Sequence, residues 1–201
     1  MEQRTDEWFA ARCGKVTASR IADVCAKTKT GYGASRASYM AQLVAEQLTG
    51  KPTEGYTNAA MQWGTEQEPA ARNAYSARVG ELVEECGFVP HATLNAGASP
   101  DGLVGEGLVE IKCPNTLTHL DTIYDQQIPS KYVLQMQFQM ACTNRPWCDF
   151  ASFDPRLPEN LQLYIKRVPR DETTIAMIEK EVAQFIAELD AKVKHLKEIQ
   201  L

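Results

Sequence analysis

Two acidic residues and a lysine lie close together in the middle of the chain, within the stretch DGLVGEGLVEIK from Asp101 to Lys112. Glu110 and Lys112 are separated by one residue, so in an extended strand their side chains point to the same face. Carboxylate oxygens are preferred ligands of Mg²⁺. A metal ion beside a cationic side chain is one way to hydrolyse a phosphodiester. Asp101, Glu110 and Lys112 therefore indicate a site for metal-assisted phosphodiester hydrolysis.

A short glycine turn between two β-rich runs predicts a hairpin at this site. If Gly105 and Glu106 form a two-residue type II′ turn, Asp101 lies directly opposite Glu110 on the neighbouring strand. The Cβ atoms of such a cross-strand pair are about 5 Å apart, which is close enough for one metal ion. The alternative is an ordinary surface hairpin that exposes Glu110 and Lys112 to solvent.

The pattern of the remaining chain predicts a mixed α/β fold, with a central sheet flanked by helices. A basic loop rich in glycine, serine and threonine is expected between two early helices. A third helix is expected to be interrupted near Gly64 and Pro69. We predict helices over 17–26, 38–49, 57–79 and 131–143, and strands near 82–83, 88–89, 93–94, 149–153 and 161–168.

The last segment, from Asp171 onward, gives the clearest helical pattern. Its apolar residues recur at alternating spacings of three and four, which places them on one face of a long helix. We expect this face to pack on the sheet, although it could instead contribute to assembly. The stripe comprises Ile175, Ile178, Val182, Ile186, Leu189, Val193 and Leu196.

Composition favours an ordinary globular protein. The 201 residues are 44% apolar and 23% charged, and we expect one domain over 1–201. No apolar run approaches the ~18 residues of a bilayer span, and the first residues do not resemble a signal peptide. We therefore expect a cytoplasmic protein with no membrane contact. The six cysteines lack the spacing of zinc or iron–sulfur sites and are expected to be reduced.

The net charge of −5 is unevenly distributed. Residues 1–51 contain eight lysines and arginines against five acidic residues, whereas residues 54–110 contain two against nine. A basic segment followed by an acidic one fits phosphate contacts beside a metal-binding carboxylate pair. An ordinary uneven surface would give the same distribution.

The motifs resemble those of a known nuclease family. Pro100-Asp101 followed by Glu110-Ile111-Lys112 resembles the PD-(D/E)xK nuclease signature. Further segments in the family's order, over about residues 8 to 156, narrow the resemblance to the lambda exonuclease and YqaJ-type viral recombinase (alkaline exonuclease) family. These segments are RCGKVTAS from Arg12 to Ser19, Trp63-Gly64 with Glu68-Pro69-Ala70, and Gln135-x-Gln137.

The resemblance implies a restriction-endonuclease-like core and roles for individual residues. Asp101 and Glu110 would ligate Mg²⁺, with Mn²⁺ as a substitute, helped by the main-chain carbonyl of Ile111. Lys112 would orient or activate the attacking water and offset negative charge in the transition state. Gln135 matches a family residue near the active site. On a helix, Gln139 would share the face of Gln135 while Gln137 points elsewhere.

Two further sets of residues each have a second interpretation. By resemblance, Glu68 is an additional catalytic acid that reaches the metal through water, but Thr65-x-x-Glu68 is also a helix capping box. Arg12 and Ser19, with Thr17 beside them, match residues that hold the terminal 5′-phosphate of DNA. The unpaired N–H groups at a helix start would favour that phosphate, whereas Thr17 or Ser19 could simply cap the helix.

The resemblance implies a Mg²⁺-dependent exonuclease. It would degrade linear double-stranded DNA from 5′-phosphorylated ends in the 5′-to-3′ direction, releasing mononucleotides and leaving a 3′ single strand for recombination by annealing. It also implies a ring of three subunits and a single-strand annealing protein as partner. The alternatives are a PD-(D/E)xK endonuclease and a non-catalytic DNA-end-binding module.

Overall fold

The computed structural model describes residues 2–53 and 58–200. Its centre is a four-stranded sheet with the order β6-β7-β8-β9. The β6–β7 and β8–β9 pairs are antiparallel and the β7–β8 pair is parallel, so the predicted mixed sheet is confirmed. The strands are β6 (Gly102–Val104), β7 (Gly107–Lys112), β8 (Trp147–Phe153) and β9 (Leu163–Pro169).

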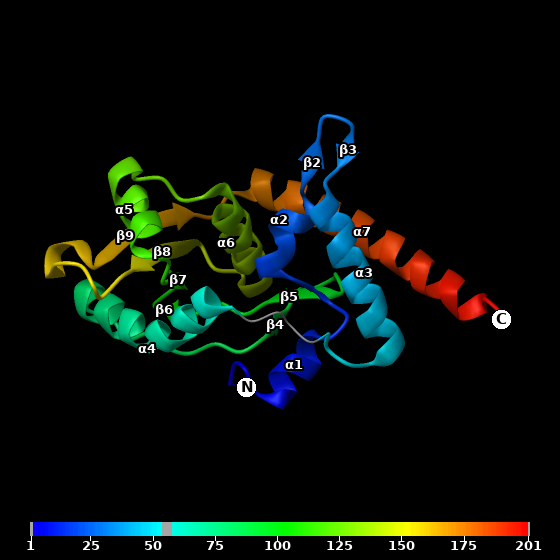
Figure 1. Cartoon of the computed structure of the whole chain (residues 1–201), viewed down its shortest axis with the longest axis horizontal. Helices are drawn as coiled ribbons and strands as arrows, with labels where there is room; N and C mark the ends of the chain where they lie inside the picture. Colours follow the sequence, from blue (N-terminus) through cyan, green and yellow to red (C-terminus); the bar gives the residue numbers. More distant parts are fainter. Residues whose placement is uncertain (1, 54–57, 201) are drawn as a thin grey trace.

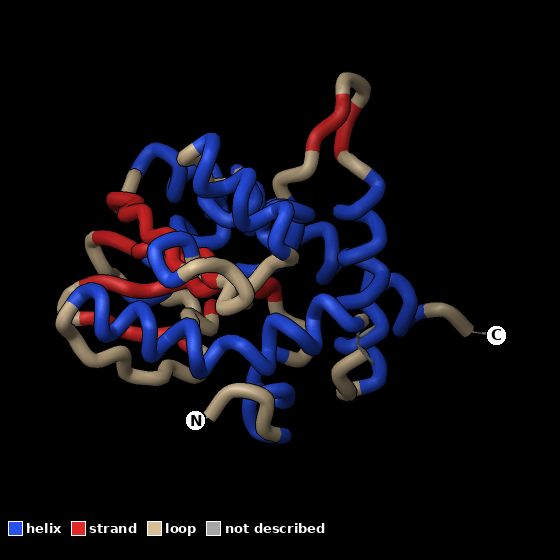
Figure 2. The backbone as a smooth tube through the Cα atoms, turned by 60° about the vertical axis from the view of Figure 1, so that its left-hand side comes forward, coloured by secondary structure: helices blue, strands red, loops and turns tan. Residues whose placement is uncertain are grey.

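Helices cover both faces of this sheet, as Figures 1 and 2 show. On one face, Tyr75 of α4 is buried in a cluster with Val109 and Ile111 of β7. On the other face, Met136 and Met140 of α6 pack against β7 and β8. Burial from both sides explains why β7 is apolar over most of its length. The two helices are α4 (Ala59–Val79) and α6 (Ser130–Thr143).

A second, three-stranded sheet has the order β1-β5-β4. The prediction of three strands over 82–94 is wrong in part. That stretch forms only β4 and one isolated bridge between Glu84 and Leu103. Its one proline, Pro90, lies inside β4 and pairs with Gly97, whereas residues 93–94 form a bend before β5. The strands are β1 (Val16–Thr17), β4 (Val89–Pro90) and β5 (Ala96–Ala98).

The helix expected over 17–26 is wrong in its extent. Val16 and Thr17 pair in parallel with Ala96 and Gly97 of β5, which keeps this stretch extended. Only a 3₁₀ turn and one short helix follow. The elements at this end of the chain are α1 (Asp6–Arg12), β1, η1 (Ala18–Arg20) and α2 (Ile21–Val24).

The basic loop expected over 26–38 is instead a small hairpin, which projects from the body of the molecule in Figures 1 and 2. The N–H of Gly33 donates to the carbonyl of Ala26 at 2.8 Å and closes its base. The following helix starts four residues earlier than expected. These elements are β2 (Lys27–Thr28), β3 (Gly31–Tyr32) and α3 (Ala34–Thr49).

The third predicted helix, α4, is not interrupted. It passes through Gly64 and Pro69 and starts after Asn58, whose side chain accepts a hydrogen bond from the N–H of Met61 at 2.9 Å. The expected first residue, Thr57, lies outside the described residues. Burial of Ala71 and Tyr75 against the sheet holds the second half in place despite the proline.

The long C-terminal helix is confirmed as α7 (Glu172–Glu198), which is capped by Asp171. Its apolar stripe packs mainly on α2, α3 and α6 rather than on the four-stranded sheet, which corrects the expected packing. Within the described residues, no helix has the length and apolar character needed to cross a bilayer. The remaining elements are α5 (Thr116–Asp125) and η2 (Glu159–Leu161).

Candidate active site

The β6–β7 hairpin has the predicted register. Gly102 pairs with Val109 and Leu103 with Leu108, so the preceding Asp101 lies opposite Glu110. In the two-residue turn Gly105 has φ +49° while Glu106 does not have a positive φ, as a type II′ turn requires. The N–H of Ile111 also donates to Asp101 Oδ2 at 2.7 Å. The Asp101 carboxylate is therefore held beside β7.

Side chains of α6 orient the carboxylate of Glu110, which is 1% exposed. Gln135 Nε2 donates to Oε1 at 2.7 Å and Gln139 Nε2 donates to Oε2 at 2.6 Å. Lys112 Nζ also donates to Oε1. Gln137 lies on another face and donates to the carbonyl of Pro169, as the helical spacing predicted. The alternative of an ordinary surface hairpin is wrong for Glu110, because this side chain is buried.

The electrostatics of Asp101 and Glu110 suit the binding of a cation. Burial raises the pKa of the Asp101 carboxyl to about 8, and the negative charge of Glu110 adds to the shift. Burial alone would lower the pKa of Lys112, but Glu110 and Asp101 outweigh it and raise that pKa. The buried carboxylate of Glu110 and the partly buried carboxylate of Asp101 therefore face each other, with one ammonium, that of Lys112, bonded to Glu110. An added divalent cation would stabilise this arrangement.

The donor set also matches a hard metal ion. In the part of the chain that the structure describes, no group of three or more histidine, cysteine or acidic side chains could hold a metal. A metal held by Asp101 and Glu110 would have two carboxylate ligands, and a main-chain carbonyl and waters would complete its coordination, as is common for Mg²⁺. Burial raises the pKa of the nearby Cys113 thiol to about 12, so it does not offer a thiolate.

One cavity of about 180 Å³ unites the two groups of residues that the sequence singled out. Arg12, Thr17 and Ser19 line one part of it, although they lie some 90 residues before the hairpin in the sequence. The carboxylates and the lysine line another part. The polar and aromatic residues that line this cavity are Gln3, Arg4, Trp8, Arg12, Thr17, Ser19, Ser99, Asp101, Glu110, Lys112, Gln135 and Gln139.

Arg12 is positioned by an aromatic ring. Its guanidinium carbon lies 3.8 Å from the centroid of the Trp8 ring, and Trp8 Nε1 donates to Ser99 Oγ at 2.9 Å. Burial lowers the pKa of Arg12. Among the described residues, no acceptor or acidic side chain pairs with its guanidinium. A partly buried guanidinium that bonds to no acidic side chain in the described part of the chain is suited to a phosphate, although the charge of Glu46 acts on it from nearby.

Thr17 and Ser19 lie beside Arg12, with their hydroxyl oxygens 3.4 Å apart. The simple capping interpretation is wrong for Thr17, because its side chain makes no capping hydrogen bond. Ser19 is inside the 3₁₀ turn, and Arg20 precedes α2. Because α2 has only four residues, its dipole contributes little. The hydroxyl groups and Arg12 are thus the main polar features of this part of the cavity.

Glu68 lies next to the hairpin, but it is ion-paired. Arg4 Nη2 is 2.5 Å from one oxygen of Glu68, and Arg72 Nη2 is 2.8 Å from the other. The capping-box interpretation is wrong, because Thr65 lies inside α4 and bonds back to the carbonyl of Met61. Both carboxylate oxygens of Glu68 are therefore bonded to arginines, and its contact with the metal through water stays a prediction.

Sequence reasoning missed Arg4 and Gln3 as site residues, and Gln139 was placed only by helical spacing. A second cavity of about 580 Å³ adjoins the hairpin from the side of α4. It is lined by Arg4, Asp101 and Lys112 together with Lys131 and Tyr132 of α6. Lysines and tyrosines give no signal of their own in sequence, so these two could be found only from the fold.

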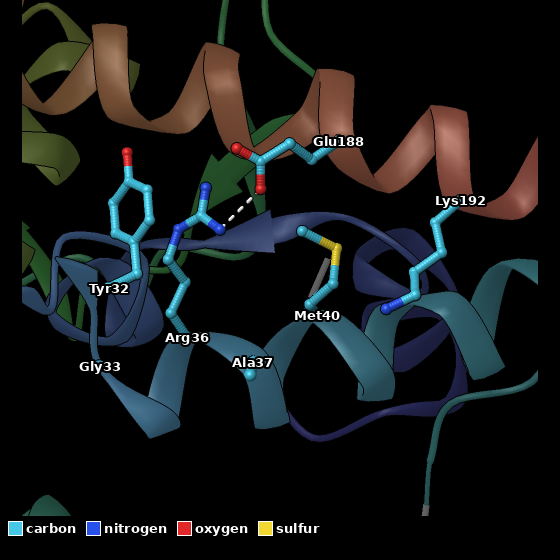
Figure 3. A pocket seen from close by; sticks show the side chains of 7 residues that line it. All are labelled: Tyr32, Gly33, Arg36, Ala37, Met40, Glu188 and Lys192. Carbon is cyan, nitrogen blue, oxygen red and sulfur yellow. Dashed lines mark hydrogen bonds and ion pairs between the residues drawn. The ribbon is translucent and has the colours of Figure 1, made fainter. Parts of the chain in front are cut away.

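A further cavity, of about 340 Å³, lies between α3 and α7, as Figure 3 shows. There Arg36 Nη1 pairs with Glu188 at 2.7 Å, and the guanidinium stacks on Tyr32 at 3.8 Å. None of the catalytic candidates lines this cavity. The chemistry is therefore assigned to the hairpin and not to this pocket.

The fold and site together define a nuclease core of the PD-(D/E)xK type: a mixed sheet between helices, with two carboxylates and a lysine on its hairpin. The model of the YqaJ-like viral recombinase domain matches residues 7–146. The chain belongs to this family, as the motifs predicted.

Solved structures support the same assignment. The chain is similar to LHK-Exo, an alkaline exonuclease from Laribacter hongkongensis, with 55% identity over 96% of both chains. The TM-scores are 0.90 for LHK-Exo in complex with dAMP and 0.89 for a second structure of it. A phage-related exonuclease from Haemophilus somnus 129PT shares the fold at 16% identity and TM-score 0.75, over 90% of this chain and 96% of that one. A search of the curated proteins gave no match.

Proposed function

We propose that the protein is a divalent-metal-dependent DNA exonuclease that degrades linear duplex DNA from 5′-phosphorylated ends in the 5′-to-3′ direction. Family membership and the similarity to LHK-Exo support a DNA exonuclease. One observation supports the polarity: the Arg12–Ser19 segment and the Asp101–Lys112 hairpin line the same cavity. A 5′-phosphate bound at Arg12 would place the next phosphodiester near the carboxylates.

Asp101 and Glu110 would hold the cation, with the main-chain carbonyl of Ile111 and, through water, Glu68. Mg²⁺ is the proposed ion and Mn²⁺ its substitute. A bound divalent ion supplies Lewis-acid stabilisation and a more acidic water. Gln135 and Gln139 act as positioning residues, because they fix the rotamer of Glu110 through both of its oxygens.

Lys112 supplies a fixed positive charge next to the phosphate. Its raised pKa keeps the ammonium protonated. A protonated lysine orients the attacking water through a hydrogen bond and offsets the negative charge that develops on the phosphoryl oxygens. Trp8 and Arg12 close the other side of the cavity and would position the terminal phosphate.

We propose mononucleotides as products and a 3′ single strand as the remaining DNA. The cavity beside Arg12 is small, at about 180 Å³, and the structure of the relative LHK-Exo contains dAMP, a nucleoside monophosphate.

A single-strand annealing protein is the proposed partner in recombination. A ring of three subunits is the proposed assembly, because it would let a chain of net charge −5 enclose DNA. A monomer mass in light scattering would contradict the ring.

The decisive experiment compares linear and covalently closed circular duplex DNA, with Mg²⁺ or with EDTA. The linear substrates carry either a 5′-phosphate or a 5′-hydroxyl. We expect loss of linear DNA only, faster from the phosphorylated end and only with metal.

The two alternative functions give different results in the same experiment. Cutting of the closed circle would assign the protein to the PD-(D/E)xK endonucleases while retaining the metal site. Binding of DNA ends with no cutting of either substrate would indicate a non-catalytic end-binding module.

A further inference from the structure

The segment before α1 forms part of the active-site wall, although it lies outside the region matched by the family model, which starts at residue 7. Gln3 Nε2 donates to the carbonyl of Cys86 at 2.7 Å and to the carbonyl of Pro100 at 2.8 Å. Pro100 is the residue directly before Asp101. These two hydrogen bonds fix the segment against the base of the catalytic hairpin.

The next residue, Arg4, has an unusual backbone conformation with φ +68°. A non-glycine residue in the left-handed region is uncommon, and the surrounding hydrogen bonds must maintain it. This conformation directs the side chain of Arg4 to Glu68 of α4, at 2.5 Å. The guanidinium is therefore held at a defined place beside the hairpin.

That place is the junction of three cavities. Arg4 and Asp101 both line the cavity that contains Arg12, the cavity that contains Tyr132, and a third cavity of about 140 Å³. A strand whose 5′ end occupies the first cavity and whose continuation occupies the second must pass this junction. Arg4 stands there together with Asp101 and Lys112.

The guanidinium of Arg4 has N–H donors that bond to no other described residue. Its side chain is 47% exposed, and Nη2 is its one guanidinium nitrogen that bonds to another described residue. Glu68 does not depend on Arg4 for a counter-charge, because Arg72 pairs with its other oxygen from one helical turn away. A role limited to neutralising Glu68 therefore does not account for the position of Arg4.

We propose that Arg4 is a substrate-contacting residue that binds the scissile phosphate, in the cavities that Lys112 also lines. Arg12 would bind the terminal 5′-phosphate. The inference rests on the proposed function for the path of the strand. An arginine at this junction adds donors for the nonbridging oxygens of the phosphate, where two carboxylates would otherwise repel it.

The test measures DNA binding by wild type, Arg4→Gln and Arg72→Gln, with Ca²⁺ in place of Mg²⁺ and intact DNA verified afterwards. Arg72 is the matched control, because it pairs with the same Glu68 but lines neither of the two larger cavities. The duplexes carry a 5′-phosphate and either an ordinary or a neutral methylphosphonate first internucleotide linkage. Thermal unfolding of each variant checks the fold, and Arg4→Lys tests whether a charge alone restores binding.

We expect Arg4→Gln to weaken binding of the ordinary duplex by roughly tenfold, the scale of one lost charged contact. It should lower the slope of log affinity against log salt by about one. The methylphosphonate linkage should weaken DNA binding by the wild type and by Arg72→Gln more than binding by Arg4→Gln. The reason is that Arg4→Gln has already lost its contact with the charged phosphate. Equal sensitivity of all three proteins to the neutral linkage would overturn the inference.

This result can be separated from the proposed function. Failure of the wild-type protein to cut linear DNA with Mg²⁺ would contradict the exonuclease proposal. The binding comparison would still decide the role of Arg4, because it does not depend on cleavage.

Discussion

Gln139 Nε2 donates a hydrogen bond of 2.6 Å to Glu110 Oε2, which joins α6 to β7, the strand that carries Glu110 and Lys112. Gln135, one helical turn earlier, donates to the other oxygen. The carboxylate thus has both oxygens fixed by a helix that packs on the opposite side from α4. Its orientation depends on the docking of α6 as much as on the hairpin.

The first prediction concerns this positioning. Gln139→Leu should raise the Mg²⁺ concentration for half-maximal cleavage by roughly 10- to 100-fold, because removing a hydrogen-bond partner of a ligand loosens it. The control is Gln137→Leu on the same helix, whose side chain bonds instead to the carbonyl of Pro169 and the N–H of Asp171. It should lower stability and leave the metal dependence unchanged. The same change in metal dependence for both variants would contradict the assignment.

The second prediction concerns the lysine. Lys112→Ala should reduce single-turnover cleavage by roughly 1,000-fold or more, because a fixed cation at the phosphate is lost. The Lys112 side chain is 27% exposed, so the fold should persist. The measurement is a cleavage time course together with circular dichroism melting. Unaltered turnover in a folded variant would remove Lys112 from the mechanism.

The third prediction concerns end recognition. Arg12→Ala should lower the rate ratio between 5′-phosphate and 5′-hydroxyl substrates by roughly 10- to 100-fold, the scale of a charged hydrogen bond to phosphate. The control is Arg20→Ala, since Arg20 is already occupied by Asp23 and Gln42. That variant should retain the preference. If Arg12→Ala lowers the cleavage rate equally for 5′-phosphate and 5′-hydroxyl substrates, Arg12 does not contribute to the binding of the terminal phosphate.

The fourth prediction concerns stability and pH. Burial would raise the pKa of Asp154, but hydrogen bonds from Arg156 and Thr116 outweigh it and lower that pKa to about 2. The folded value lies below the unfolded value of about 3.9. The stabilisation is therefore fully present above about pH 5 and is lost as the pH falls towards 2.

This interaction can be tested by replacing its carboxylate. Asp154→Asn should reduce the free energy of unfolding by roughly 1–3 kcal/mol at pH 7 and by less near pH 2.5. The measurement is urea unfolding of both proteins at the two pH values. A difference that does not depend on pH would show that the charge of Asp154 contributes nothing.

The hairpin could be predicted to the residue because its geometry is local. A two-residue turn fixes the register of both strands, and a glycine at its first position provides the positive φ. Asp101 and Glu110 could thus be placed face to face from sequence alone. The long helix after Asp171 could be predicted equally well, because its 27 residues have apolar side chains at a consistent helical spacing.

Features that depend on distant partners could not be predicted. Thr17 was expected to start a helix and is instead paired with Gly97 of β5, which local propensity does not register. Arg4 gives no signal in the sequence, because its position depends on hydrogen bonds between Gln3 and residues more than 80 positions away. The β2–β3 hairpin was missed because its strands contain only two residues each.

The proline inside α4 removes one main-chain hydrogen bond from that helix. Pro69 has no N–H to donate to the carbonyl of Thr65, a residue that lines the larger cavity. The part after it is anchored in the core through Tyr75. Because this hydrogen bond is absent, we expect the part before Pro69, which includes Gly64 and borders the cavity, to be displaced more readily than the part after it. We therefore expect a substrate bound in that cavity to shift the first half of α4 and to leave the strand that carries Glu110 in place.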